Sequence, residues 1–177
     1  MKPPTEILLD AVSFAARAHR HQIRKDKETP YAAHPFRVCL VLRHVFGIDD
    51  PAVLTAALLH DTIEDTPTDF DDIAERFGEG VAGWVAVLTK DMRLRDDIRE
   101  PAYFAALAAG DWQVQLIKLA DLYDNLCDSS HLPPTTRQRS VRRAREFVEF
   151  FRPHVKAGAG DAFALTEARL AEAVSAI

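Results

Sequence analysis

The sequence has little cysteine and no apolar run long enough to span a bilayer, and both absences narrow its function. Its two cysteines, Cys39 and Cys127, form no CxxC pair. We therefore expect buried free thiols rather than a disulfide or a cysteine-bound zinc ion. The longest apolar segments, such as residues 53–59, are short, and the N-terminus lacks a basic segment followed by a long apolar one. These features predict a soluble, cytoplasmic protein with no membrane partner.

An excess of positive charge is also missing. The formal net charge is −5, so we expect no nucleic-acid partner, and any phosphate site must be local. With 47% hydrophobic residues in 177, the chain can bury one good core, which predicts a single domain over residues 1–177 with a C-terminal helix over residues 160–177. The sequence leaves the oligomeric state open, and a homo-oligomer is compatible with it.

Alternating patterns of strand length are absent, whereas apolar residues recur at helical spacing along most of the chain. The second helix should have Pro35 as its first residue, because a proline lacks the N–H that this position leaves unused. The fold class predicted is an all-α, single-domain helical bundle. The expected helices cover residues 5–20, 35–46, 53–64, 69–77, 80–89, 101–109, 112–126, 136–151 and 162–177.

The expected helix over residues 53–64 is apolar on nearly every side and then ends in polar side chains. Residues four apart share a helix face, so His60 lies near Glu64, and Asp61 near Asp65. A solvated helix end would explain a lone His-Asp pair. A helix this apolar is buried, however, and buried carboxylates require a compensating cation. A metal ion is the simplest one.

A second polar cluster interrupts the apolar segment "QLIKLADLYDNL", in which Asp121 and Asn125 share a face. His34, at the start of another expected helix, is a further candidate ligand. The resulting ligand set is His34, His60, Asp61 and Asp121. Nitrogen and oxygen ligands without a thiolate favour Mn²⁺, Fe²⁺ or another divalent ion rather than structural zinc. Because such an ion keeps bound water molecules, the set indicates a catalytic site.

Four stretches in this order, "HRHQIRKDKETPYAAHP", "AALLHDTIEDT", "FGEGVAGWVAVLTK" and "IKLADLYDNL", resemble the HD-type hydrolase domain of RelA/SpoT homologues. Those enzymes degrade the alarmone (p)ppGpp. The resemblance covers roughly residues 5–150. Within this family, the chain is most similar to the stand-alone small alarmone hydrolases, including the metazoan SpoT homologue type. Their fold is a helical HD-domain bundle.

The resemblance implies a metal-dependent phosphohydrolase that removes the 3′-pyrophosphate of (p)ppGpp. It assigns Mn²⁺ to the same four residues that the helix spacing selected. It further implies that Glu64 and Asp65 orient and deprotonate the attacking water, and that Arg24, Lys25 and Asn125 bind the nucleotide. A 3′-diphosphate repels hydroxide, so the reaction needs a divalent ion and local positive charge. Glu64, one helical turn after a ligand, is the best candidate for the general base.

The chain also departs from the family pattern. His21 stands where the family usually has glycine, and Leu122 where it commonly has arginine or lysine, so some phosphate-binding cations are missing or replaced. The basic segment "TTRQRSVRRAREF" offers replacements, and Arg142 is our choice because its spacing ahead of Phe147 resembles that in the corresponding helix of the small hydrolases. An ordinary solvated basic face explains this segment equally well.

Two alternative functions remain open from the sequence. The same site could act on (p)ppApp, NADPH or a deoxynucleoside monophosphate. A different class of protein, a non-catalytic alarmone-binding module, would use the pocket without turnover. The presence of Glu64 and Asp65 argues against that module, because a pure binder needs no buried pair of water-activating carboxylates.

Overall fold

The computed structural model describes residues 3–129 and 132–176, and within them the secondary structure is helical apart from one isolated antiparallel bridge between Ile23 and Pro30. The expected all-α bundle is therefore confirmed. None of the described helices is long and apolar enough to cross a membrane. The helices are α1 (Pro4–Ala18), α2 (Ala33–His44), α3 (Pro51–Leu59), α4 (Thr62–Asp65), α5 (Phe70–Phe77), α6 (Glu79–Leu88), α7 (Asp96–Ala109), α8 (Trp112–Asp128), α9 (Pro134–Phe151), α10 (Gly160–Ser175), and the 3₁₀ turns Arg152–His154 and Ala157–Ala159.

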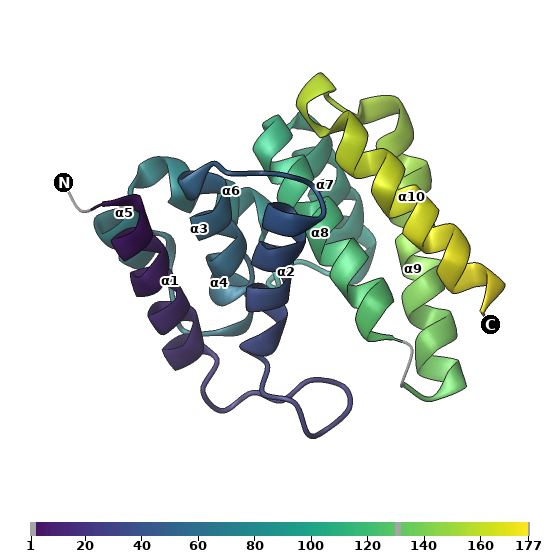
Figure 1. Cartoon of the computed structure of the whole chain (residues 1–177), viewed down its shortest axis with the longest axis horizontal. Helices are drawn as coiled ribbons and strands as arrows, with labels where there is room; N and C mark the ends of the chain where they lie inside the picture. The colour runs from purple at the N-terminus through teal and green to yellow at the C-terminus, as the bar shows by residue number, and fades with distance from the viewer. Residues whose placement is uncertain (1–2, 130–131, 177) are drawn as a thin grey trace.

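Helix α3 lies at the centre of one half of the bundle. It packs against α1, α2, α6 and α8, and every residue from 53 to 59 is buried (Figure 1). Its start is defined by Asp50, whose side chain accepts the Ala52 N–H, and by Pro51 at the first position. Because α3 is apolar on all sides, it has no polar face that could contact water, and it is stable only inside the bundle.

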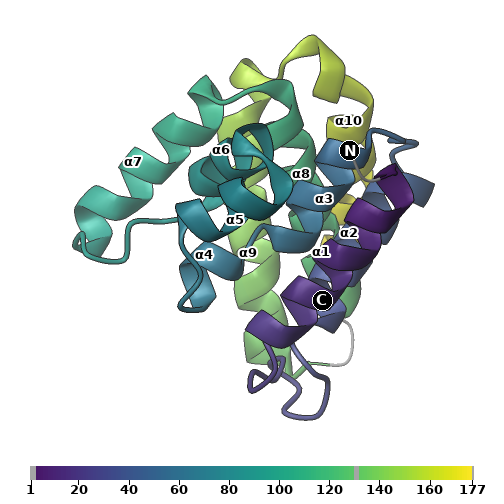
Figure 2. The same cartoon turned by 90° about the vertical axis from the view of Figure 1, so that its left-hand side faces the viewer.

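Helix α8 is the internal helix of the other half. It packs against α2 on one side and against α9 and α10 on the other, while α1 and α5 lie at the far end of the molecule (Figure 1). Helix α7 runs along the edge beside α6 (Figure 2). The C-terminal helix, expected over residues 160–177, runs to Ser175 within the bundle, and residue 177 lies outside the described residues.

Two helices begin earlier than their prolines predicted. Helix α2 begins at Ala33 rather than Pro35, and α7 begins at Asp96 rather than Pro101. Pro35 is the third residue of its helix, where the N–H would still have no partner inside the helix. Pro101 lies inside α7, where the first turn is supported by Asp96, which pairs with Arg99.

The expected continuous helix over residues 53–64 is interrupted. Helix α3 ends at Leu59, and the single turn α4 begins at Thr62. The Thr62 hydroxyl donates to the Leu59 carbonyl at 2.7 Å and so satisfies a backbone acceptor that the helix end leaves unused. A helical turn follows at once, because the Asp65 N–H donates to the Asp61 carbonyl at 2.9 Å. His60 and Asp61 thus occupy the junction itself.

Candidate active site

The four expected metal ligands come together from three places in the chain. His34 lies in the first turn of α2, His60 and Asp61 at the junction of α3 and α4, and Asp121 in the middle of α8. Ligand atoms of His34, His60 and Asp121 all lie within 4.8 Å of one another. Asp61 lies beside them, with Oδ2 3.1 Å from His60 Nε2 and 3.6 Å from His34 Nε2.

Hydrogen bonds to the far sides of both imidazoles fix which nitrogen faces the cluster. His60 Nδ1 lies 2.8 Å from the Ala57 carbonyl, which can only accept, so Nδ1 carries the proton. His34 Nδ1 lies 2.8 Å from Asp124 Oδ2 in the same way. His60 Nε2 is buried, and its contact with Asp61 Oδ2 at 3.1 Å does not have the geometry of a hydrogen bond. A buried nitrogen of this kind suits a metal ligand, so the residues fit a divalent ion.

Both carboxylates of the cluster are ionised. Burial alone would raise the pKa of Asp121, but the ammonium group of Lys118, 2.7 Å away, and His34 hold that pKa well below its ordinary value. Burial likewise would raise the pKa of Asp61, and the imidazoles of His60 and His34 lower it instead. Two fixed negative charges therefore face the two histidines, which is the arrangement that a divalent cation requires.

The same charges act on the imidazoles. Burial lowers the pKa of His34, but its hydrogen bonds to Asp121 and Asp124 outweigh burial and raise that pKa to about 9. Burial also lowers the pKa of His60, and Asp61 raises it above its ordinary value. A metal ion that binds His34 Nε2 would therefore have to displace a proton from it.

Glu64 and Asp65 reach the same cavity from α4, but their surroundings differ. Glu64 Oε2 accepts the Lys90 backbone N–H at 2.9 Å. Burial raises the pKa of Glu64, and the Lys90 N–H only partly offsets that effect. Asp65 is exposed as a residue, yet burial of its carboxyl group and the charge of Asp61 raise its pKa too. Glu64 is thus the better held of the two.

A cavity of about 290 Å³ lies over the ligand cluster. Leu88, Tyr103 and Phe147 form apolar parts of the cavity wall. Five lysine and arginine side chains also line the cavity, so it is locally positive although the chain as a whole carries a net negative charge. Such a group of cations is what a local phosphate site requires. Polar and charged residues that line the cavity are Arg24, Lys25, Tyr31, His34, His60, Asp61, Glu64, Asp65, Lys90, Lys118, Asp121, Asn125, Ser140 and Arg143.

The three residues expected to bind the nucleotide all line this cavity, although their guanidinium, ammonium and amide groups are held differently. Asn125 donates its amide to the Asp121 carbonyl oxygen at 3.0 Å and to the Asp121 carboxylate, so it orients a candidate metal ligand. Arg24 donates from Nε and from a terminal nitrogen to Asp128 Oδ2, at 3.1 and 2.7 Å. Lys25 is exposed as a residue and lines the cavity. Partial burial of its ammonium group and the charge of the neighbouring Arg24 lower the pKa of Lys25.

The basic segment on α9 contributes a different arginine from the one expected. Arg142 is exposed and is not among the lining residues, whereas Arg143 lines the cavity. Residues 143 and 147 are one helical turn apart, so Arg143 shares the face of Phe147. Glu100 on α7 pairs with Arg143 at 3.4 Å and with Lys90 at 3.2 Å, and so links two of the cavity's cations.

Sequence reasoning missed two groups that touch the candidate site. The Tyr31 hydroxyl donates to Asp61 Oδ2 at 2.6 Å, so this residue orients a candidate ligand in addition to forming part of the wall. Lys90 holds Glu64 through its backbone and lines the cavity through its side chain. Neither contact leaves a periodic signal, because each joins segments that lie far apart in sequence.

Comparison with known proteins gives consistent results. A family model described as "HD domain" matches residues 11–153. The zebrafish (Danio rerio) protein named guanosine-3′,5′-bis(diphosphate) 3′-pyrophosphohydrolase MESH1 is 40% identical over 164 residues, which cover 92% of this chain and 90% of the relative. The human protein of the same name is 41% identical over 162 residues, covering 91% and 89%.

A solved structure described as "A metazoan ortholog of SpoT hydrolyzes ppGpp and plays a role in starvation responses" superposes with a TM-score of 0.81. Its sequence identity to this chain is 32%, and the match covers 99% of this chain and 97% of that one. The similarity therefore extends over the whole fold, including the C-terminal helix α10.

Proposed function

Because this chain belongs to the HD domain family, we propose that it is a metal-dependent phosphohydrolase that removes pyrophosphate from the 3′ position of (p)ppGpp. The name of relatives about 40% identical over nearly their full length supports the substrate. The observation that carries the reaction type is the convergence of His34, His60 and Asp121, with Asp61 beside both imidazoles, under a cavity lined by cations. Residues 1–177 act as one domain in this proposal.

The proposed metal ligands are His34, His60, Asp61 and Asp121. Mn²⁺ is the preferred ion, with Fe²⁺ or another divalent ion as the alternative, because the donors are nitrogen and oxygen without a thiolate. When bound, the ion supplies positive charge opposite the diphosphate and lowers the pKa of water. The buried Nε2 of His60 and the fixed charges of both carboxylates support this assignment.

Glu64 is the proposed general base. One of its oxygens is held by the Lys90 N–H, and the raised pKa of its carboxyl favours uptake of the proton that the attacking water loses. Asp65, its exposed neighbour on the same turn, positions the water or shares the proton. Arg24, Lys25 and Asn125 bind the nucleotide and its phosphates, with Arg143 as the cavity-facing arginine of α9.

The proposal is tested by incubating the purified chain with ppGpp, ppApp, NADPH and dAMP, with Mn²⁺ and with a chelator, and separating the products by ion exchange. Metal-dependent release of pyrophosphate from ppGpp is the expected result. Release from ppApp alone would keep the chemistry and change the purine base, and phosphate release from NADPH or dAMP alone would change the substrate class. Binding of ppGpp without any product would favour the alarmone-binding module.

Replacing Arg143 by alanine should raise KM for ppGpp by roughly three- to tenfold, because the substrate loses a charge-assisted hydrogen bond. The effect is smaller than for a buried arginine, since Arg143 is half exposed and already pairs with Glu100. The matched control is Arg142→Ala, which removes the same charge one residue away, outside the cavity. Its KM should stay within about twofold of the wild-type value. Steady-state kinetics at fixed ionic strength measure both, and equal KM values for the two variants would contradict the assignment.

A further inference from the structure

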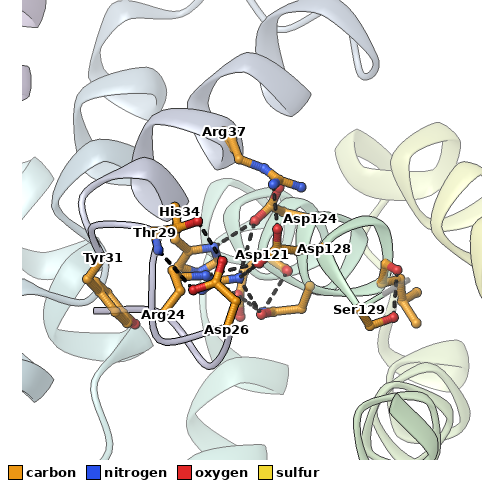
Figure 3. Close-up of polar contacts among 12 residues, drawn as sticks. Arg24, Asp26, Thr29, Tyr31, His34, Arg37, Asp121, Asp124, Asp128 and Ser129 are labelled. Atoms are coloured by element: carbon orange, nitrogen blue, oxygen red, sulfur yellow. Dashed lines mark hydrogen bonds and ion pairs between the residues drawn. The ribbon is translucent and has the colours of Figure 1, made fainter. Parts of the chain in front are cut away.

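Asp124, on α8, is a buried carboxylate that the proposed chemistry does not use. It is 1% exposed and lies one turn beyond Asp121. Its two oxygens have different partners, as Figure 3 shows: Oδ2 lies 2.8 Å from His34 Nδ1, and Oδ1 accepts the Arg37 Nε–H at 2.6 Å. A carboxylate this deeply buried requires such partners, because an unpaired buried charge is costly.

The ion pairs continue from Asp124 along α8. Arg37, three residues after His34 on α2, also donates from a terminal nitrogen to Asp128 Oδ1 at 2.6 Å. Asp128, one turn after Asp124, accepts from Arg24 through its other oxygen. A ladder of alternating charges thus runs from a candidate metal ligand to an arginine that lines the cavity (Figure 3). We call Asp124, Arg37, Asp128 and Arg24 the ion-pair ladder.

The physical consequence for His34 is specific. A carboxylate can only accept, so Asp124 requires a proton on His34 Nδ1. Nε2, 3.1 Å from Asp121 Oδ1, is then the nitrogen that binds an ion once it has lost its own proton. An amide in the same place has a donor group as well as an acceptor. It could donate to Nδ1 and so move the imidazole proton to Nε2, where it would block ligation.

We propose that Asp124 is a positioning residue that fixes the tautomer and orientation of the metal ligand His34, and that the ion-pair ladder holds the substrate-facing Arg24 in the same framework. This inference rests on the proposed function, because it assigns roles toward the same metal ion and nucleotide. It goes further in linking the two halves of the site. One continuous set of contacts joins α2 and the connection before it to α8, and it orients both the proposed metal ligand His34 and Arg24, which is proposed to bind the nucleotide.

The test compares Asp124→Asn with Asp128→Asn in the full chain, after circular dichroism has shown that each is folded. Titration with Mn²⁺ should give a dissociation constant about 10- to 100-fold weaker for Asp124→Asn, as is typical when a partner of a ligating histidine is lost. Asp128→Asn cuts the ladder beyond Arg37. It should leave the Mn²⁺ dissociation constant within about twofold and raise KM for ppGpp several-fold, because Arg24 loses the charge of its nearest partner and keeps only longer contacts with Asn125 and Asp124. Equal Mn²⁺ affinity in Asp124→Asn and wild type would overturn the role of Asp124.

A spectroscopic readout separates positioning from a merely structural role. In Co²⁺-loaded protein, the Nδ1 protons of ligating histidines give shifted NMR signals that disappear in D₂O. The wild type should show two, from His34 and His60, and Asp124→Asn should lose or shift one. The signal from His60, bonded to the Ala57 carbonyl, is the internal control and should remain. Two unchanged signals in Asp124→Asn would overturn the proposal. The absence of a second signal in the wild type would also overturn it, and this measurement remains available if the variant does not fold.

Metal titration and NMR need no turnover, so failure of the two proposals can be told apart. Wild-type protein that binds Mn²⁺ with the expected loss in Asp124→Asn, but hydrolyses none of the nucleotides, would overturn the proposed function and leave the role of Asp124 standing. Normal hydrolysis of ppGpp with unchanged Mn²⁺ affinity in Asp124→Asn would do the reverse. A wild type that binds no divalent ion would overturn both.

Discussion

Replacing Glu64 by glutamine should lower kcat by about 10²-fold or more while the metal ion stays bound. Glutamine keeps the size of the side chain, and its amide oxygen can still accept the Lys90 N–H. It cannot take a proton from water. The loss should therefore appear in kcat, with metal content by elemental analysis equal to that of the wild type.

The pH profile gives this prediction a second measurement. A general base works only when it is deprotonated, and burial raises the pKa of Glu64 above its ordinary 4.5. Wild-type kcat should thus be level above that raised pKa and fall as the pH decreases through it, and Glu64→Gln should lack this fall. Asp65→Asn removes the adjacent, exposed carboxylate; it is free to lower the rate, but it should keep the fall with decreasing pH because Glu64 is still present. Turnover of Glu64→Gln near the wild-type rate would exclude the role.

Replacing Asp61 by alanine should abolish both metal binding and turnover. Asp61 Oδ2 approaches both imidazoles of the cluster, so its loss removes a ligand and half of the negative charge that faces the ion. Elemental analysis after gel filtration should find metal in the wild type and in Asp65→Asn but not in Asp61→Ala. Thermal melts of the metal-free proteins control for stability, because Tyr31 also loses its acceptor. Equal metal content in Asp61→Ala and wild type would contradict the ligand assignment.

The ligand cluster could be selected from the sequence because its residues interrupt apolar helices. A helix that is apolar all round has to be internal, and the burial of residues 53–59 confirms this for α3. Polar residues at its end, and those at one face of α8, therefore had to share the interior. The same reasoning could have identified Asp124, since a carboxylate in an internal helix needs partners.

Other features depended on packing that no local pattern carries. The choice between Arg142 and Arg143 depends on how α9 is rotated against α8, and the packing of Val141, Ala144 and Phe147 decides that rotation. The early starts of α2 and α7 show that a proline marks a position a helix tolerates, not the position where it begins. Contacts such as that of Tyr31 with Asp61 join distant segments and have no sequence signature.

The position of α3 also sets the order in which parts of the site can open. Amide hydrogens of a helix enclosed on all sides exchange with solvent only when much of the fold opens, whereas exposed loops exchange through small local openings. His60 and Asp61 end this enclosed helix, while Arg24 and Lys25 lie on the connection between α1 and α2, where most residues are exposed or half-buried. Amide hydrogens near His60 and Asp61 should therefore exchange more slowly than those of the exposed residues of that connection, although the Arg24 side chain is itself held by Asp128.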